Sequence, residues 1–280
     1  MTGISITPLG ETIAARVEGL DLSAALSLEV RAAVLDAIGK YKVLVFSGDA
    51  LEIAAFRAFA RVFGPLQEHV LRKYRHQEFP DLSWLTNVAE DGSIDAFGNI
   101  RATTWHSDGS YTQDPPELGI LHAFEVPSQG GATIFADMCN AYDTLDADMQ
   151  VRAATLTGLH RHGAGPGGTM YENALDDDQE EKSNDAVHPI VTVHPSTGRK
   201  HLYLNETHTR RFREMEPSES FDLLQNLMVH ATRPENTYTH EWSVGDVLMW
   251  DQRSTIHRGA GDFPPDQRRV KIRAIVEELD

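Results

Sequence analysis

Trp105-His106-Ser107-Asp108 and, far downstream, Trp250-Asp251-Gln252-Arg253-Ser254-Thr255-Ile256-His257 carry most of the information in this sequence of 280 residues. His106 and Asp108 are two positions apart, so their side chains leave the same face of an extended strand. The two residues can therefore chelate one ion from a single strand end. His257 completes a set of three ligands if the fold brings the second run back beside the first.

Two imidazoles and one carboxylate on one face of an octahedral ion leave the opposite positions open, which is the ligand set of non-haem Fe(II) oxygenases. A short motif is weak evidence by itself, because the chain holds 13 His and 42 acidic residues. The competing interpretation of His106 is a histidine that is hydrogen-bonded at a strand end. A further element at suitable spacing is needed to choose between the two.

That further element is a strand near the C-terminus, where apolar residues alternate with cationic ones from Val270 to Val276. If the strand already includes Arg269, then Arg269 and Arg273 project to the same side, about 13 Å apart. A guanidinium binds a carboxylate through two parallel hydrogen bonds. An Arg twelve residues after His257 therefore suggests a dicarboxylate anchored beside the ion. The alternative is that these arginines are exposed charges at a strand end.

His-x-Asp, a distant His and a following Arg resemble the Fe(II)/2-oxoglutarate-dependent dioxygenases, and the wider sequence resembles the taurine dioxygenase (TauD/TfdA-like) group. The fragments that carry the resemblance are Ile6-Thr7-Pro8-Leu9-Gly10, Val17-Glu18-Gly19-Leu20-Asp21-Leu22, Val43-Leu44-Val45-Phe46, Phe63-Gly64-Pro65-Leu66-Gln67-Glu68-His69, Gly130-Gly131-Ala132-Thr133 and Val193-His194-Pro195-Ser196-Thr197-Gly198. Gln252 departs from the group, which usually has Asn in a Trp-Asp-Asn-Arg run. Because this position is next to the metal ligands and is not one of them, the departure affects how a ligand side chain is oriented and does not argue against metal binding.

The resemblance implies a reaction and the residues that support it. Fe(II) would be held by the catalytic set His106, Asp108 and His257, with 2-oxoglutarate and O2 as co-substrates. The distal carboxylate of 2-oxoglutarate would pair with Arg269 and with the hydroxyl of Thr133. The products would be succinate, CO2 and a substrate hydroxylated at a C–H bond. A jelly-roll metal-binding protein without oxygenase activity, such as an isomerase-like cupin or a small-molecule binder, is the alternative.

The resemblance also indicates what kind of substrate the pocket takes. His69 and Arg273 match positions that face the substrate, and Arg273 lies between substrate and co-substrate in the group. Their presence suggests an anionic organic molecule: a sulfonate, a sulfate ester, an aryloxyalkanoate, or an amino-acid-like or natural-product acid. Arg72, Thr207 and His208 stand where the taurine enzyme has aromatic residues, so they are candidate substrate residues of a different pocket.

Composition restricts the partners. The formal charge of −17 argues against nucleic acid, because phosphate binding requires a basic surface. No apolar run is long enough to span a membrane, and no secretory signal is visible at the N-terminus. Cys139 is the single cysteine, so an intrachain disulfide is impossible and a reducing cytoplasm is the simplest compartment. The basic cluster at 72–76 could attract an anion or could be paired with nearby acids.

The resemblance implies a single domain over 1–280 of mixed α/β, mainly β class: a double-stranded β-helix (jelly roll) with flanking helices. The apolar spacing predicts helices from Leu28 to Ile38, with Ser27 as N-cap and Gly39 as stop, around Phe56–Phe63, and through Phe221, Leu224 and Met228. Strands are expected at 43–46, 118–126 and 246–250. Residues 163–187, glycine-rich and then acidic, suggest a lid or a solvated loop. The resemblance also implies a homo-oligomer, a dimer or tetramer.

Overall fold

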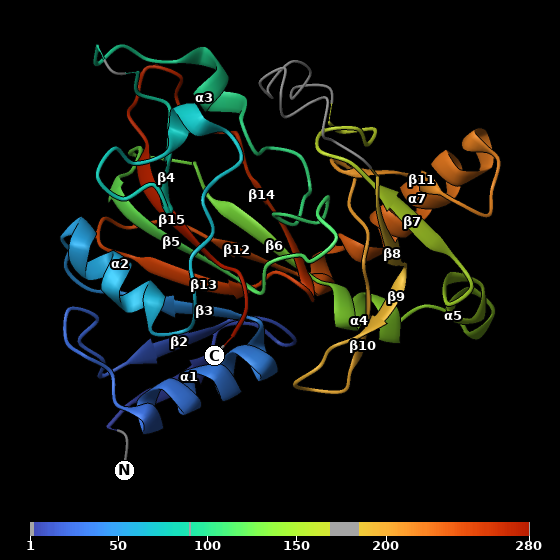
Figure 1. The fold of residues 1–280 in the computed structure, drawn as a ribbon, viewed down its shortest axis with the longest axis horizontal. Coiled ribbons are helices and arrows are strands. Elements are labelled where there is room, and N and C mark those ends of the chain that lie inside the picture. Colours follow the sequence, from blue (N-terminus) through green and yellow to red (C-terminus); the bar gives the residue numbers. More distant parts are fainter. Residues whose placement is uncertain (1–2, 90, 169–184, 280) are drawn as a thin grey trace.

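A large antiparallel sheet forms the centre of the protein, seen in a computed structural model that describes residues 3–89, 91–168 and 185–279 (Figure 1). The strand order is β1-β2-β3-β13-β5-β15-β4, and only β2 and β3 pair in parallel. The strands are β1 (Ser5–Pro8), β2 (Ala15–Glu18), β3 (Val43–Phe46), β13 (Val247–Asp251), β5 (Leu118–Glu125), β15 (Val270–Val276) and β4 (Leu82–Thr86).

A second sheet lies against one face of the large sheet. It consists of β12 (Thr237–His240), β6 (Thr133–Asp137) and β14 (Thr255–Gly259). Successive side chains of a strand point to opposite faces, so alternate residues of β3 and β13 reach this sheet. The shared core contains Val45 and Trp250 from the large sheet and Phe135 from β6. The space between the two sheets is therefore filled where these strands cross.

Two helices cover the other face of the large sheet. They are α1 (Leu28–Tyr41) and α2 (Ile53–Arg61), which lie in blue beside β2 and β3 in Figure 1. Their core includes Ile272, Ala274 and Val276 of β15. Because side chains alternate along β15, Lys271 and Arg273 point the opposite way, into the space between the sheets. The pattern predicted for this strand is confirmed, although it begins at Val270, directly after Arg269.

Two small sheets and the helices α4, α5 and α7 form the other end of the molecule, to the right in Figure 1. The small sheets are β10-β9 and β11-β7-β8, and α4, α5 and α7 pack in a separate core with Ile256 of β14. The bounds are α4 (Met138–Asp143), α5 (Ala147–Ala153), β7 (Thr157–His160), β8 (Ala186–Pro189), β9 (Val191–Val193), β10 (Lys200–Leu202), β11 (Thr209–Phe212) and α7 (Pro217–Ala231). The short helices are η1 (Arg72–Tyr74), α3 (Ala96–Ile100) and η3 (Pro234–Asn236).

The mixed α/β, mainly β class is confirmed, and the predicted helices and strands exist with shifted ends and faces. The Ser27 side chain caps α1, accepting from the Val30 backbone N–H at 3.3 Å. The stop at Gly39 is wrong, because α1 continues to Tyr41 and ends at Lys42 in the left-handed conformation. Lys42 is held there by a buried ion pair with Asp137 at 3.0 Å.

Three apolar residues that the predicted stripes place on buried helix faces are exposed. Leu28 is 83% exposed at the start of α1, and Phe221 is 50% exposed on α7. Ala32 of α1 is exposed as well. The buried faces are turned by about one position: Val34, Ala37 and Ile38 face the core in α1. Apolar spacing predicted where these helices lie better than which side they bury, because a short stripe fits two neighbouring orientations.

Most of the predicted lid, 169–184, lies outside the described residues. Its flanking glycines at 163–168 lie against the backbone of Glu206 and Thr207, where a β-carbon on Gly165 would approach the Glu206 carbonyl oxygen to 2.3 Å. None of the helices in the described ranges is long and apolar enough to cross a membrane.

Candidate metal and co-substrate site

The backbone brings the two distant histidines together. His106 and His257 form an isolated antiparallel bridge: the His106 N–H donates to the His257 carbonyl at 3.0 Å, and the His257 N–H donates back at 2.8 Å. Their rings lie 4.3 Å apart between centroids. With Asp108, they offer ligand atoms that all lie within 4.8 Å of one another. The three side chains are therefore placed to hold one ion.

Each imidazole is oriented by its surroundings. The His106 Nδ1–H donates to the Thr104 carbonyl at 2.7 Å, which leaves Nε2 as the free ligand atom. The His257 ring stacks on Phe135 at 5.7 Å, and its Nε2 lies 3.9 Å from Asp108 Oδ2. Burial lowers the pKa of both histidines. Neutral imidazoles at physiological pH are the form that binds metal.

Asp108 is held from two sides. Gln252 donates from Nε2 to Asp108 Oδ2 at 3.1 Å and accepts the Asp108 backbone N–H at 3.2 Å. Arg273 donates from Nη1 to Oδ1 at 2.7 Å. Burial would raise the pKa of this carboxyl, but the Arg273 guanidinium, the two histidines and the Gln252 hydrogen bond together outweigh it, and the pKa lies well below its ordinary value. The carboxylate is thus ionised, and Gln252 can orient it although Asn was expected at this position.

A second subsite lies further into the space between the sheets. Arg269 is 3% exposed, and its backbone is fixed by Asn87, whose Oδ1 accepts the Arg269 N–H at 2.8 Å. Its Nη1 lies 3.6 Å from where a β-carbon on Gly259 would sit. Gly259 pairs with Thr133 between β14 and β6, so the strand register brings the guanidinium to the Thr133 end of β6. Burial and the charge of Arg101 lower the pKa of Arg269 to about 10, which leaves it charged.

A pocket of about 50 Å³ opens onto the ligand set. Three predicted substrate residues line it: His69, His208 and Arg273. Arg72 is exposed on η1, and Thr207 is buried with its hydroxyl bonded to the Trp105 carbonyl at 2.9 Å. Neither of these two is among the described residues that line this pocket, so their substrate roles remain predictions without support from the pocket.

Besides apolar lining residues, sequence reasoning missed three polar side chains that line this pocket: Arg101, Tyr111 and His162. Arg101 is 6% exposed, lies over the Tyr74 ring at 3.9 Å and donates to the Trp84 carbonyl at 2.9 Å. An arginine five positions before the first predicted ligand, in so acidic a chain, was the available signal. Tyr111 and His162 carried no comparable pattern.

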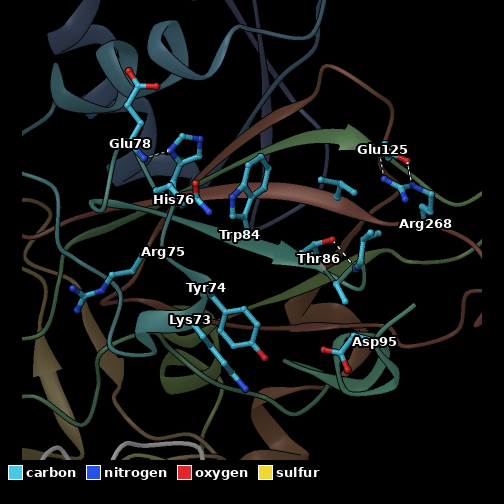
Figure 2. A pocket seen from close by; sticks show the side chains of 14 residues that line it. Lys73, Tyr74, Arg75, His76, Glu78, Trp84, Thr86, Asp95, Glu125 and Arg268 are labelled. Atoms are coloured by element: carbon cyan, nitrogen blue, oxygen red, sulfur yellow. Dashed lines mark hydrogen bonds and ion pairs between the residues drawn. The ribbon is translucent and has the colours of Figure 1, made fainter. Parts of the chain in front are cut away.

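A larger pocket, of about 560 Å³, lies elsewhere, against the outer edge strand β4 (Figure 2). Lys73, Arg75 and His76 of the predicted basic cluster line it, but charges there are engaged. Arg75 pairs with Glu68. Arg268 donates to Glu125 at 2.7 and 2.9 Å (Figure 2). Lys73 lies over the Tyr74 ring at 4.9 Å. The paired interpretation of the basic cluster therefore fits the structure better than an anion trap, and none of the three predicted ligands lines this pocket.

Comparison with known proteins gives consistent matches over almost the whole chain. Residues 5–275 match the family described as taurine catabolism dioxygenase TauD, TfdA family. Pentalenolactone F synthase of Streptomyces arenae is 31% identical, covering 99% of this chain and 96% of its own. The α-ketoglutarate-dependent 2,4-dichlorophenoxyacetate dioxygenase of Cupriavidus pinatubonensis is 35% identical over 90% of each chain. The solved structure of AAD-2 with Mn(II) and N-oxalylglycine superposes with a TM-score of 0.86 at 30% identity, covering 99% of this chain and 98% of its own.

Proposed function

Because the chain belongs to the TauD, TfdA family, we propose that it hydroxylates a C–H bond of a small anionic organic substrate. It is an α-ketoglutarate-dependent dioxygenase that uses Fe(II), 2-oxoglutarate and O2. The alternative of a metal-binding protein without oxygenase activity is not supported. Two of the curated relatives are named as α-ketoglutarate dioxygenases, and the AAD-2 structure contains Mn(II) and N-oxalylglycine.

In this proposal His106, Asp108 and His257 hold Fe(II). The donor set fits, because two neutral imidazoles and an ionised carboxylate converge within 4.8 Å in a buried setting. Bound Fe(II) would supply O2 activation coupled to decarboxylation of the co-substrate. Gln252 keeps the Asp108 carboxylate turned toward the histidines, and the Thr104 carbonyl fixes the His106 tautomer.

The distal carboxylate of 2-oxoglutarate is assigned to Arg269 and Thr133. The single observation that carries the proposal is their position: a buried arginine whose Nη1 lies beside Gly259, next to Thr133 and two residues from His257. A guanidinium buried this deeply requires a counter-charge, and a dicarboxylate that also chelates the ion provides one.

The substrate anion is assigned to the pocket beside the ion. Arg101 and Arg273 contribute two cations to its lining, and Asp108, its one carboxylate among the described lining residues, is committed to the metal. His69 lies in the same wall, and burial, with the charges of Arg273 and Arg101, lowers its pKa well below the ordinary value. His69 is therefore a neutral hydrogen-bonding group, with His208 opposite as part of an aromatic wall with Tyr111 at 4.8 Å.

The names of the relatives narrow the substrate to organic acids or esters. One relative is named for 2,4-dichlorophenoxyacetate, another for sulfate esters and another for pentalenolactone F. We favour a carboxylate, sulfonate or sulfate ester. Hydroxylation next to a heteroatom would cleave the substrate, and hydroxylation elsewhere would leave an alcohol.

Further parts of the proposal concern the whole chain. The facing sheets are proposed to be the two halves of a double-stranded β-helix (jelly roll), within a single domain over 1–280. Support comes from the core shared by β3, β13 and β6. A lid around 163–187, a homo-oligomeric state (dimer or tetramer) and a cytoplasmic location remain predictions.

The proposal is tested by anaerobic titration of the Fe(II)-loaded protein with 2-oxoglutarate, followed by the visible metal-to-ligand charge-transfer band. We expect the band in the wild type and a much higher half-saturating concentration in Arg269→Ala. Anionic candidates are then compared with their neutral amides or alcohols for substrate-dependent succinate release. Iron binding without the band would refute the assigned co-substrate site, and equal turnover of the neutral analogues would refute the anionic substrate.

A further inference from the structure

Lys271 is a buried cationic residue that the proposed reaction leaves without a role. It lies on β15 between Arg269 and Arg273, on the face that points between the two sheets. Its side chain is fully buried (0% exposed), and its Nζ makes no hydrogen bond to any residue that the structure describes. An unpaired amine in such a place is costly, so a partner is expected.

The surroundings of Lys271 are those of the co-substrate subsite. Its Nζ lies 3.7 Å from the centre of the Trp242 ring. The Nε1–H of that tryptophan donates to Thr133 Oγ1 at 2.9 Å. Lys271 therefore reaches the proposed carboxylate site from the Trp242 side, and the guanidinium of Arg269 reaches it from the Gly259 side.

The described residues do not neutralise this pair of cations. No ion pair joins Arg269 or Lys271 to an acid within the described ranges. Asp246 is the acidic group whose charge is felt at Lys271. Its Oδ2 already accepts from His240 Nε2 at 3.1 Å and from the Ser243 N–H at 2.9 Å. The missing negative charge fits a bound carboxylate.

We propose that Lys271 is a second cationic contact for the distal carboxylate of 2-oxoglutarate. The proposal rests on the proposed function, since it assumes that Arg269 and Thr133 form that subsite. Burial, with the charge of Arg269, holds the pKa of Lys271 well below its ordinary value. A carboxylate bound beside the amine would favour its charged form and raise that pKa.

The test uses calorimetric titration of the Mn(II)-loaded protein, so that binding is measured without turnover. The ligands are 2-oxoglutarate and 2-oxopentanoate, which has a methyl group in place of the distal carboxylate. Lys271→Met keeps the length and the contact with Trp242 but removes the charge. We expect it to weaken 2-oxoglutarate binding by about tenfold to a hundredfold and to leave 2-oxopentanoate binding unchanged. Lys40→Met is the matched control, because Lys40 lies over the Tyr41 ring at 4.8 Å on the outer helix α1.

Lys271→Gln is a second variant that removes the charge, and it is titrated with both ligands in the same way. We expect it, like Lys271→Met, to lose affinity for 2-oxoglutarate and to keep its affinity for 2-oxopentanoate. Wild-type affinity for 2-oxoglutarate in a folded Lys271→Met variant would overturn the proposal and leave Lys271 as packing for Trp242. If Lys271→Met does not fold, wild-type affinity for 2-oxoglutarate in Lys271→Gln overturns it. Retention of tight 2-oxoglutarate binding by Arg269→Ala as well would instead refute the subsite assigned under the proposed function.

Discussion

Replacing Gln252 with Leu should weaken metal binding without removing a metal ligand. Gln252 is 1% exposed and makes two hydrogen bonds to Asp108, to Oδ2 at 3.1 Å and from the backbone N–H at 3.2 Å. A hydrogen bond to a charged group contributes about 1.5–3 kcal/mol. Loss of such an orienting contact typically lowers metal affinity about tenfold to a hundredfold. Leu has a similar size, so the cavity is filled and the hydrogen bonds alone are lost.

The assay is titration of the apoprotein with Mn(II), followed by electron paramagnetic resonance of the free ion. Thermal unfolding of the apo form is measured in parallel, because the Asp108 N–H left without an acceptor should cost about 1–3 kcal/mol of stability. Gln150→Leu is the control: it removes a hydrogen bond to the Tyr142 carbonyl (3.0 Å) on α5, away from the metal ligands. An unchanged Mn(II) Kd in a folded Gln252→Leu variant would refute the orienting role.

Four further changes have expected outcomes. His106→Ala or His257→Ala should abolish Fe(II) binding or turnover, measured by iron content and succinate release; full activity in either would remove that ligand. Arg269→Ala should raise the KM for 2-oxoglutarate by at least about tenfold, and an unchanged KM would remove Arg269 from the site. Arg273→Ala should raise the substrate KM and the uncoupled formation of succinate by a larger factor than the Mn(II) Kd, although Arg273 also bonds to Asp108 at 2.7 Å; loss of metal with an unchanged substrate KM would contradict this. His160 is buried with a pKa of about 3. The unfolded state therefore binds a proton at this residue below about pH 6.5 and the folded state does not. His160 alone should lower the free energy of unfolding by about 1.4 kcal/mol per pH unit as the pH drops from 6.5 toward 3. Urea unfolding of wild type and His160→Phe across that range should show a shallower fall in the variant.

The features of the site that depend on the two-residue repeat of an extended strand could be predicted from the sequence. The spacing of His106 and Asp108 and the alternation that turns Arg273 inward are local properties of extended chain. The pairing of His106 with His257 could be expected only through the family resemblance, since nothing local relates two segments so far apart. The bridge between their backbones shows that the distant segment does return.

What escaped prediction depends on contacts between elements. Lys42 ends α1 in a left-handed conformation, and its buried amine pairs with Asp137 at the start of α4, a residue far away in the sequence. Arg101 enters the pocket wall because it stacks on Tyr74 and bonds to the Trp84 carbonyl. The sequence showed Lys271 only as one of the cationic residues that alternate with apolar ones along this strand. It is buried because the second sheet covers this face of β15. No periodicity in the sequence carries this information.

The mutual backbone hydrogen bonds of His106 and His257 have a consequence for how the ligand set tolerates change. The two amide–carbonyl pairs, at 3.0 and 2.8 Å, set the spacing of both imidazoles by strand pairing. A substitution that shifts either backbone segment therefore moves two of the three proposed ligands relative to each other, although no ligand side chain is altered. The metal site depends in this way on residues that never contact the ion.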